Sequence, residues 1–336
     1  AAAAAQGLLG DNFANGFASH ATMSQSARSL ARAAAASFHP PPRQLTSLLV
    51  KSPCAQTLVR AGDSHAAAFN AVHCSAFWVA LGRLARDSPE QRQWLHAQPT
   101  ALDPARETTL RLLSTFKPRE LASTACGAAH AGVGSKGHWP PFWSSLAAAA
   151  EPVLRDFRSL ELKELAWAFS KAGAAQAGAI PPPTLDALAL EAGERIEDLQ
   201  SDEVAMLAWS FATSGHKSEE ATRLLSGLAA AAAASDLHTF APTELATAAW
   251  AFGKAELGIA SAGFYRALAT HLPERIQQGS RASPSLPASS VAMIAWGIGK
   301  AGHATPALLD ELAVAARRHD LSIYNPRSLS NLATAY

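Results

Sequence analysis

The sequence predicts an all-α solenoid of about six to seven helix-loop-helix repeats, each of roughly 38 to 47 residues. Three observations support this prediction. A similar helical segment recurs along the chain, its tryptophans are regularly spaced, and no run of alternating β-branched residues predicts a strand. The best copies of the segment read LAWAFSKAG at residues 165–173, LAWSFATSG at 207–215, AAWAFGKAE at 248–256 and IAWGIGKAG at 294–302.

The repeat length follows from the spacing of four tryptophans, which are Trp167, Trp209, Trp250 and Trp296. The steps between them are 42 (209 − 167), 41 (250 − 209) and 46 (296 − 250) residues. Each step is long enough for two helices and two turns. The same spacing places Cys126 and Val79 at the equivalent position upstream, and Thr334 at the equivalent position downstream.

The first helix of each repeat is expected at residues 121–132, 162–173, 204–215, 245–256, 291–302 and, in a truncated copy, 329–336. We number its positions from the opening Leu or Val, which is position 0. At 100° per residue, positions 0, 3, 4, 7, 10 and 11 form an apolar stripe about 120° wide, which predicts the core face. Turns that contain Ser, Thr, Asp or Pro begin these helices, and a glutamate suits the positive helix end.

Glycines that can adopt the left-handed conformation predict the helix ends, at Gly132, Gly173, Gly215 and Gly302. Glu256 occupies this position in one repeat, where Gly258 can serve instead. The second helices are expected at residues 140–157, 181–199, 218–237, 261–276 and 305–321, and several have proline in the first turn. A Ser-, Pro- and Gly-rich insertion at residues 277–289 accounts for the 46-residue step.

Residues 1–60 differ in composition from the array expected at residues 61–336. They contain five Lys and Arg residues and one acid, Asp11, with many Ala and Ser. This composition resembles an organellar transit peptide or its remainder, and extra helices are the alternative. We expect the array to be truncated at its C-terminal end, because Tyr336 falls inside a repeat helix.

A proline-led helix, a loop and an L-A-x-x-A-W-A-F/L-x-K-A/L-G helix together resemble the octotricopeptide repeat family and related organellar RNA-binding helical-repeat proteins. The resemblance covers roughly residues 65–336. It implies a non-catalytic protein that binds and stabilises RNA, either as a component of a divergent organellar ribosome contacting rRNA or as a transcript-specific factor for an organellar mRNA. Neighbouring ribosomal or ribonucleoprotein proteins are the other implied partners. The mitochondrion is the favoured location, and the chloroplast is the alternative.

Position 9 of the first helix carries the candidate RNA-binding cations. The net charge is only +1, so the binding of a polyanion would require a local stripe of positive charge. Position 9 holds Arg83, His130, Lys171, Lys254 and Lys300, with Thr213 as the exception. Stacked repeats would align these side chains into a basic row that matches a phosphate backbone. A solvated helix end, where Lys favours the negative end of the helix dipole, is the alternative interpretation.

Positions 2, 5 and 6 are expected to point away from the core stripe together with position 9. Position 2 varies as a base-reading position would, and it holds Ser123, Glu164, Met206, Thr247 and Met293. The tryptophans occupy position 5, at the border between the core and the exposed face. Packing between adjacent repeats is the preferred interpretation for them, and base stacking is the alternative.

Neither catalysis nor a metal or organic cofactor is expected. Cys54, Cys74 and Cys126 are separated by 20 and 52 residues, which matches no zinc spacing, and no His-Glu-x-x-His motif or Ser-His-acid arrangement occurs. No run of about 18 apolar residues predicts a membrane span, so neither a membrane nor a small-molecule substrate is expected as a partner. A protein–protein scaffold without RNA contact is the alternative function, and a catalytic domain after Tyr336 is a third hypothesis.

Overall fold

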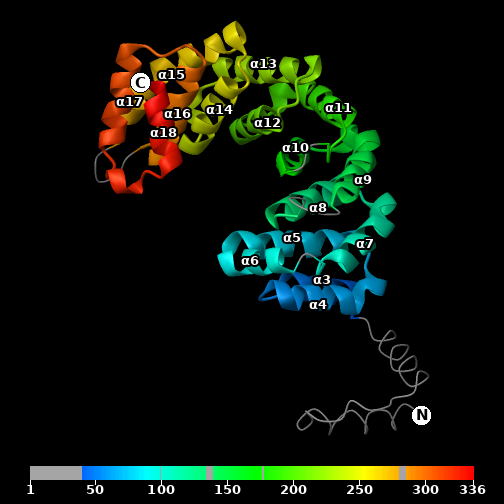
Figure 1. Cartoon of the computed structure of the whole chain (residues 1–336). Helices are drawn as coiled ribbons and strands as arrows, with labels where there is room; N and C mark the ends of the chain where they lie inside the picture. Colours follow the sequence, from blue (N-terminus) through cyan, green and yellow to red (C-terminus); the bar gives the residue numbers. More distant parts are fainter. Residues whose placement is uncertain (1–39, 99, 134–138, 176–177, 280–284) are drawn as a thin grey trace, which may run out of the picture. The chain divides into compact units, whose positions relative to one another are not determined.

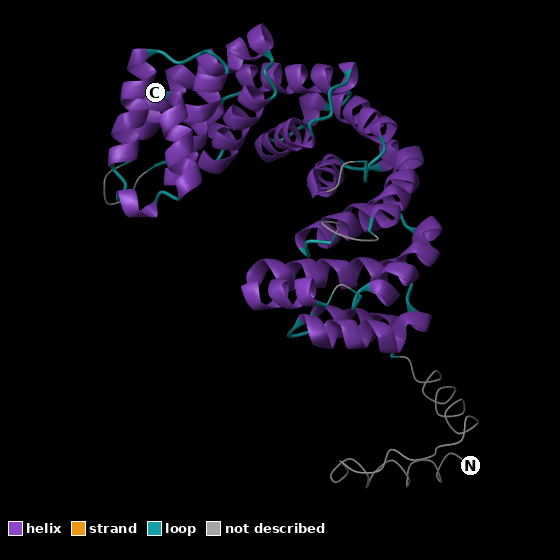
Figure 2. Ribbon diagram, in the orientation of Figure 1, coloured by secondary structure: helices purple, strands orange, loops and turns teal. Residues whose placement is uncertain are grey.

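Within residues 40–98, 100–133, 139–175, 178–279 and 285–336, which the computed structural model describes, the chain consists of helices joined by short loops, without a strand (Figure 1, Figure 2). Residues 42–336 form one compact unit. The predicted all-α repeat fold is therefore confirmed. Residues 1–39, most of the segment expected to precede the array, lie outside the described part.

One helix of each repeat packs against its counterparts in the preceding and following repeats. We call these helices the first-helix row, and successive members contact one another along the whole row. The row consists of α3 (Pro42–Val50), α5 (Ala71–Asp87), α8 (Pro118–His130), α10 (Ser159–Ala175), α12 (Ser201–Ser214), α14 (Pro242–Lys254), α16 (Ala288–Lys300) and α18 (Pro326–Ala335).

The remaining helix of each repeat belongs to a second-helix row, which most repeats extend by a short 3-10 turn. This row consists of α4 (Ala55–His65), α7 (Asp103–Leu112), α9 (Pro140–Ala150), α11 (Pro182–Gly193), α13 (Glu219–Ala234), α15 (Ala262–Gln277) and α17 (Pro306–Arg317). The 3-10 turns are η1 (Ala66–Ala68), η2 (Leu113–Thr115), η3 (Glu151–Asp156), η4 (Ile196–Asp198), η5 (Leu237–Thr239), η6 (Gly258–Ser261) and η7 (Leu321–Ile323). An additional helix, α6 (Pro89–Ala97), lies against α5.

The array begins upstream of the expected boundary. Helices α3 and α4 pack on α5, and Leu45, Leu49 and Leu58 are completely buried there. The boundary expected between residues 60 and 61 consequently falls inside α4. Residues from Pro42 onward belong to the array because their apolar side chains complete the first repeat's core.

The predicted core stripe is buried at positions 0, 3, 4 and 7, whereas position 11 was wrongly included, because it lies at the helix end and is exposed at Gly132, Gly215, Glu256 and Gly302. In α10, Leu162, Leu165 and Phe169 are at most 1% exposed, and in α14 Leu245 and Phe252 are fully buried. Position 6, however, is also buried rather than exposed, in Ala168, Ser210, Ala251 and Gly297 alike. The expectation for position 6 was wrong because a first helix packs on two neighbouring first helices as well as on second helices, so it buries more than one stripe.

Glycine at position 6 permits the closest approach between first helices. A Cβ added to Gly127 would lie 2.3 Å from the carbonyl oxygen of Trp78, and one added to Gly297 would lie 2.3 Å from that of Ala249. These distances are far inside van der Waals contact. The small residues thus set how closely α8 approaches α5 and α16 approaches α14.

Three of the predicted helix ends have the expected geometry, with positive φ at Gly132 (74°), Gly215 (68°) and Gly302 (73°). Gly173 does not end its helix, because α10 continues to Ala175 and the left-handed glycine that follows is Gly178. Glu256 itself adopts φ 55°, and it is the single non-glycine residue with positive φ among the described residues.

Glutamates, rather than the expected Ser, Thr or Asp residues, cap the starts of several first helices. The side chains of Glu120, Glu161, Glu203 and Glu244 accept hydrogen bonds from the backbone N–H groups three residues before them. A carboxylate there satisfies an otherwise unpaired donor and interacts favourably with the helix dipole.

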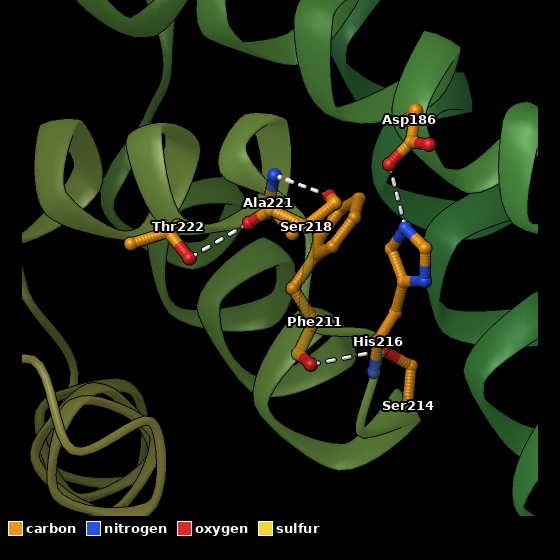
Figure 3. A network of polar contacts seen from close by, with 7 residues as sticks. All are labelled: Asp186, Phe211, Ser214, His216, Ser218, Ala221 and Thr222. Atoms are coloured by element: carbon orange, nitrogen blue, oxygen red, sulfur yellow. Dashed lines mark hydrogen bonds and ion pairs between the residues drawn. The ribbon is translucent and has the colours of Figure 1, made fainter.

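A polar junction joins three helices where α12 ends and α13 begins (Figure 3). His216 Nε2 lies 2.6 Å from Asp186 Oδ1 of α11, and Ser218 caps α13 by accepting from the backbone N–H of Ala221 at 3.1 Å. Burial favours the neutral acid, but hydrogen bonds from Ser218 and His216 lower the pKa of Asp186 below its ordinary value. The junction therefore fixes the turn within one repeat against the preceding repeat.

Candidate nucleic-acid interface

The four tryptophans lie half-buried on successive members of the first-helix row, from α10 to α16. Trp250 and Trp296 stack on each other across α14 and α16, with ring centroids 5.7 Å apart and an interplanar angle of 28°. Trp167 of α10 lies on the His130 ring of α8, with centroids 4.2 Å apart. Each contact joins two neighbouring repeats, and the partial exposure leaves part of each ring free to meet a ligand.

Lys171 lies between two of these tryptophans. Its Nζ is 4.7 Å from the centre of the Trp209 ring on α12 and 5.8 Å from that of Trp167 on its own helix. At these distances the ammonium interacts with the negative face of an indole. The contact repeats the relationship between His130 and Trp167, because in both cases position 9 of one repeat meets the tryptophan of the next.

Together with the other cations of position 9, these residues form a surface that we call the aromatic–cationic row, which comprises Arg83, His130, Trp167, Lys171, Trp209, Trp250, Lys254, Trp296 and Lys300. It runs along the first helices from α5 to α16. Thr213, half-buried, interrupts the cations at position 9 of α12. The structure thus brings together two groups of residues that the sequence analysis considered separately.

The five candidate residues at position 9 have unequal electrostatic roles. Lys254 is exposed, and no ion pair or hydrogen bond of its ammonium is formed within the described residues. Arg83 Nη2 donates to the carbonyl oxygen of Val50 at 3.1 Å. Lys300 Nζ lies 2.6 Å from Glu256 Oε1, although both side chains are substantially exposed. Such exposed pairs are weak, so an incoming phosphate can compete for Lys300.

His130 contributes a ring rather than a charge at neutral pH. Burial, and then the positive charges of Arg86 and Lys171, lower its pKa below the ordinary value. The uncharged imidazole packs on Trp167. The basic row expected at position 9 is therefore carried by Arg83, Lys171, Lys254 and Lys300.

The candidate base-reading residues at position 2 lie half-buried beside the tryptophans, one helical turn before position 5. They are Ser123, Glu164, Met206, Thr247 and Met293. Burial raises the pKa of Glu164. Thr247 Oγ1 donates to the carbonyl oxygen of Thr243 at 2.7 Å, leaving its lone pairs available to a donor. These varied groups border the tryptophans, where they can contact a base stacked on an indole.

A largely buried ion pair, which the sequence did not predict, holds together two of the helices that carry this surface. Lys163 Nζ of α10 lies 2.5 Å from Asp202 Oδ2 at the start of α12. Lys163 is only 14% exposed, so it serves the packing of α10 on α12 rather than ligand binding. The two residues are 39 positions apart, which is close to one repeat length. A search for opposite charges at this spacing could have predicted the pair.

In the described part of the chain, no group of three or more His, Cys, Asp or Glu side chains could hold a metal ion. No helix among the described residues has the length and apolar content needed to cross a bilayer. Comparison with protein-family models and with curated proteins found no match.

Proposed function

We propose that this chain is a non-catalytic RNA-binding α-solenoid that contacts single-stranded RNA along the aromatic–cationic row. The observation that carries the proposal is the position of Lys171 between the half-buried Trp167 and Trp209 of successive repeats. Base stacking on an aromatic side chain contributes about 1–3 kcal/mol per base. Lysine and arginine add a sequence-independent attraction to phosphate.

The RNA is proposed to be organellar, either rRNA in a divergent ribosome or a specific mRNA. Support comes from the octotricopeptide-like motif and from the Ala- and Ser-rich composition of residues 1–41, which contain Arg28 and Arg32 and a single acid, Asp11. The mitochondrion is favoured over the chloroplast. The net charge of +1 favours the ribosomal role, in which RNA and protein contacts are shared.

The salt dependence of binding tests the role of the cations. The charged residues of the row are Arg83, Lys171, Lys254 and Lys300. If each contacts one phosphate, the logarithm of the binding constant should fall with the logarithm of the salt concentration with a slope of about −3, because each phosphate contact to a single strand contributes about −0.7. Replacing all four by Gln should abolish most of this slope and weaken binding to a single-stranded RNA measured by fluorescence anisotropy.

A matched variant replaces four exposed arginines outside the first-helix row, namely Arg92, Arg223, Arg266 and Arg317. It removes the same charge, so affinity should change little if the row is the binding surface. An equal loss in both variants would indicate non-specific attraction. No measurable RNA binding by the unmodified chain would favour a protein–protein scaffold without RNA contact.

Crosslinking in the native organelle distinguishes the two RNA roles. Crosslinks to rRNA together with comigration with the ribosome support a ribosomal component. Crosslinks to one mRNA in lighter fractions support a transcript-specific factor.

A further inference from the structure

An arginine near the end of a second helix ties two successive repeats together through main-chain carbonyls. Arg195, just after α11, donates to the carbonyl oxygens of Phe157 and Arg155, the latter at 2.7 Å. Arg275 of α15 donates in the same way to the carbonyl oxygens of Phe240, at 2.9 Å, and His238, at 3.5 Å. In both cases the planar guanidinium bridges two acceptors that lie two residues apart.

The acceptors of the two arginines are related by the repeat. Adding the 42-residue step to residues 155 and 157 gives 197 and 199, and adding the next step of 41 gives 238 and 240. Glu197 and Leu199 are consequently the acceptors expected in the intermediate repeat. No hydrogen bond to either carbonyl oxygen is formed within residues 178–279.

The corresponding donor is absent from the intermediate repeat. Arg195 lies seven residues after the buried Leu188, and Arg275 lies seven residues after the buried Leu268. Seven residues after the equivalent Leu228, the chain has Ser235. The Ser235 hydroxyl instead donates to the carbonyl oxygen of Ala232 in its own helix, at 2.9 Å.

A cavity of about 530 Å³ lies beside Ser235 and beside the two residues that carry the expected acceptors. We call it the arginine cavity, and its lining includes Glu197, Leu199, Ala231, Ala234, Ser235 and Thr239. Glu197 and Ser235 are exposed, so the cavity opens to solvent. Both the expected acceptors and the serine that replaces the donor therefore line one cavity.

One acid, Glu197, lines the cavity, and Asp198 follows it directly in the chain. Glu197 and Asp198 are exposed. This negative charge favours a cationic ligand. The two carbonyl oxygens, two residues apart, favour a planar guanidinium with several N–H donors over a single ammonium group.

We propose that the arginine cavity binds an arginine side chain of a partner protein, whose guanidinium donates to the carbonyl oxygens of Glu197 and Leu199 beside the Glu197 carboxylate. The partner completes the contact that Arg195 and Arg275 make within the chain. The cavity lies between the end of α13 and the loop before α12, so this site is separate from the aromatic–cationic row and does not rest on the RNA proposal.

The probe for this site is N-acetyl-arginine amide, titrated into the full chain while its melting temperature is followed. The melting temperature should rise saturably, with half-saturation in the millimolar range expected for so small a ligand. The N-acetyl-lysine amide should bind at least tenfold more weakly, and the uncharged N-acetyl-citrulline amide should have no saturable effect.

Two variants that fill the cavity make the test specific. Ser235→Arg supplies the missing side chain, so it should raise the melting temperature and abolish the response to the probe. Ala231→Met fills the cavity without charge and should abolish the response as well, which keeps the test valid if Ser235→Arg fails to fold. Ala230→Arg places the same charge at an exposed position on α13 and should leave the response intact.

Three outcomes would overturn the proposal. They are an equal response to the arginine and citrulline probes, an unchanged response in the variants that fill the cavity, and no saturable response in the unmodified chain.

Discussion

The Nζ of Lys171 on α10 lies 4.7 Å from the centre of the Trp209 ring on α12. The two residues belong to successive repeats, so the contact couples the geometry of the surface to the packing of the array. Because the same ammonium also faces Trp167, a phosphate that binds there would be placed beside two stacking surfaces. A cation and two aromatic rings therefore lie together at this point of the surface.

Lys171→Met should weaken RNA binding and cost little stability. The substitution removes the ammonium and keeps an apolar side chain on the indole, so the expected loss in unfolding free energy is about 0.5–1 kcal/mol. Denaturant unfolding and fluorescence anisotropy measure the two effects. Lys254→Met is the control, because Lys254 is exposed and should lower affinity without lowering stability. Equal stability of the two variants would argue against a cation–π contact at Lys171.

Trp250→Leu should lower both the stability of the array and the affinity for RNA. It removes the stacked contact with Trp296, which contributes about 0.5–1.5 kcal/mol beyond area burial, and it removes a stacking surface worth about 1–3 kcal/mol per base. Binding to oligonucleotides with and without bases separates stacking from phosphate contact. If the variant loses affinity equally for an abasic strand, Trp250 does not stack on bases.

Gly127→Ala should destabilise the chain although alanine favours helices. The new methyl group would meet the backbone of Trp78 at 2.3 Å, and overpacking of this kind costs about 1–3 kcal/mol. Gly193→Ala is the control, since nothing lies within 4 Å of its added Cβ, and it should gain up to about 1 kcal/mol. Chemical denaturation compares the two, and a stable Gly127→Ala variant would contradict the tight packing of α8 on α5.

Stability should fall as the pH drops below about 6.5, the ordinary pKa of histidine. Burial lowers the pKa of His130 and of His271, so the unfolded chain takes up these protons at a higher pH than the folded chain does. Their contribution is fully present above the unfolded pKa and is lost as the pH falls from there through the lower folded pKa. Unfolding free energies at pH 7.5 and pH 5.5 in the unmodified chain and in His130→Gln should show a smaller decrease in the variant. An identical decrease would show that His130 is not the group that titrates.

Glu256→Gly should stabilise the chain and strengthen RNA binding. A left-handed backbone costs a non-glycine residue about 1–2 kcal/mol, and glycine removes that cost at φ 55°. The substitution also frees Lys300 from its ion pair. Glu256→Gln separates the two effects, because it frees Lys300 but keeps the strained backbone. Thermal unfolding should therefore distinguish the glycine variant from the glutamine variant, whereas anisotropy should show both binding RNA more tightly.

The sequence alone determined the repeat, its length and positions 0, 3, 4 and 7 of its core stripe, since these depend on the 3.6-residue period of the helix. It also predicted the left-handed helix ends at Gly132, Gly215 and Gly302, which depend on the conformational freedom of glycine. It also identified the candidate tryptophans and cations. It did not predict the burial of position 6, because that position faces a neighbouring first helix whose distance is set by residues a full repeat away, such as Gly127 and Trp78.

Tertiary structure decided which candidate cations are available and where the array begins. The pairing of Lys300 with Glu256, and the contact of Lys171 with Trp209, join residues in different repeats that local periodicity cannot relate. The arginine cavity is likewise lined by residues of two repeats, Ser235 on one side and Glu197 and Leu199 on the other, and a pattern within one repeat cannot predict it. Local periodicity specifies the helices and their buried faces, whereas contacts between repeats depend on how closely those helices pack.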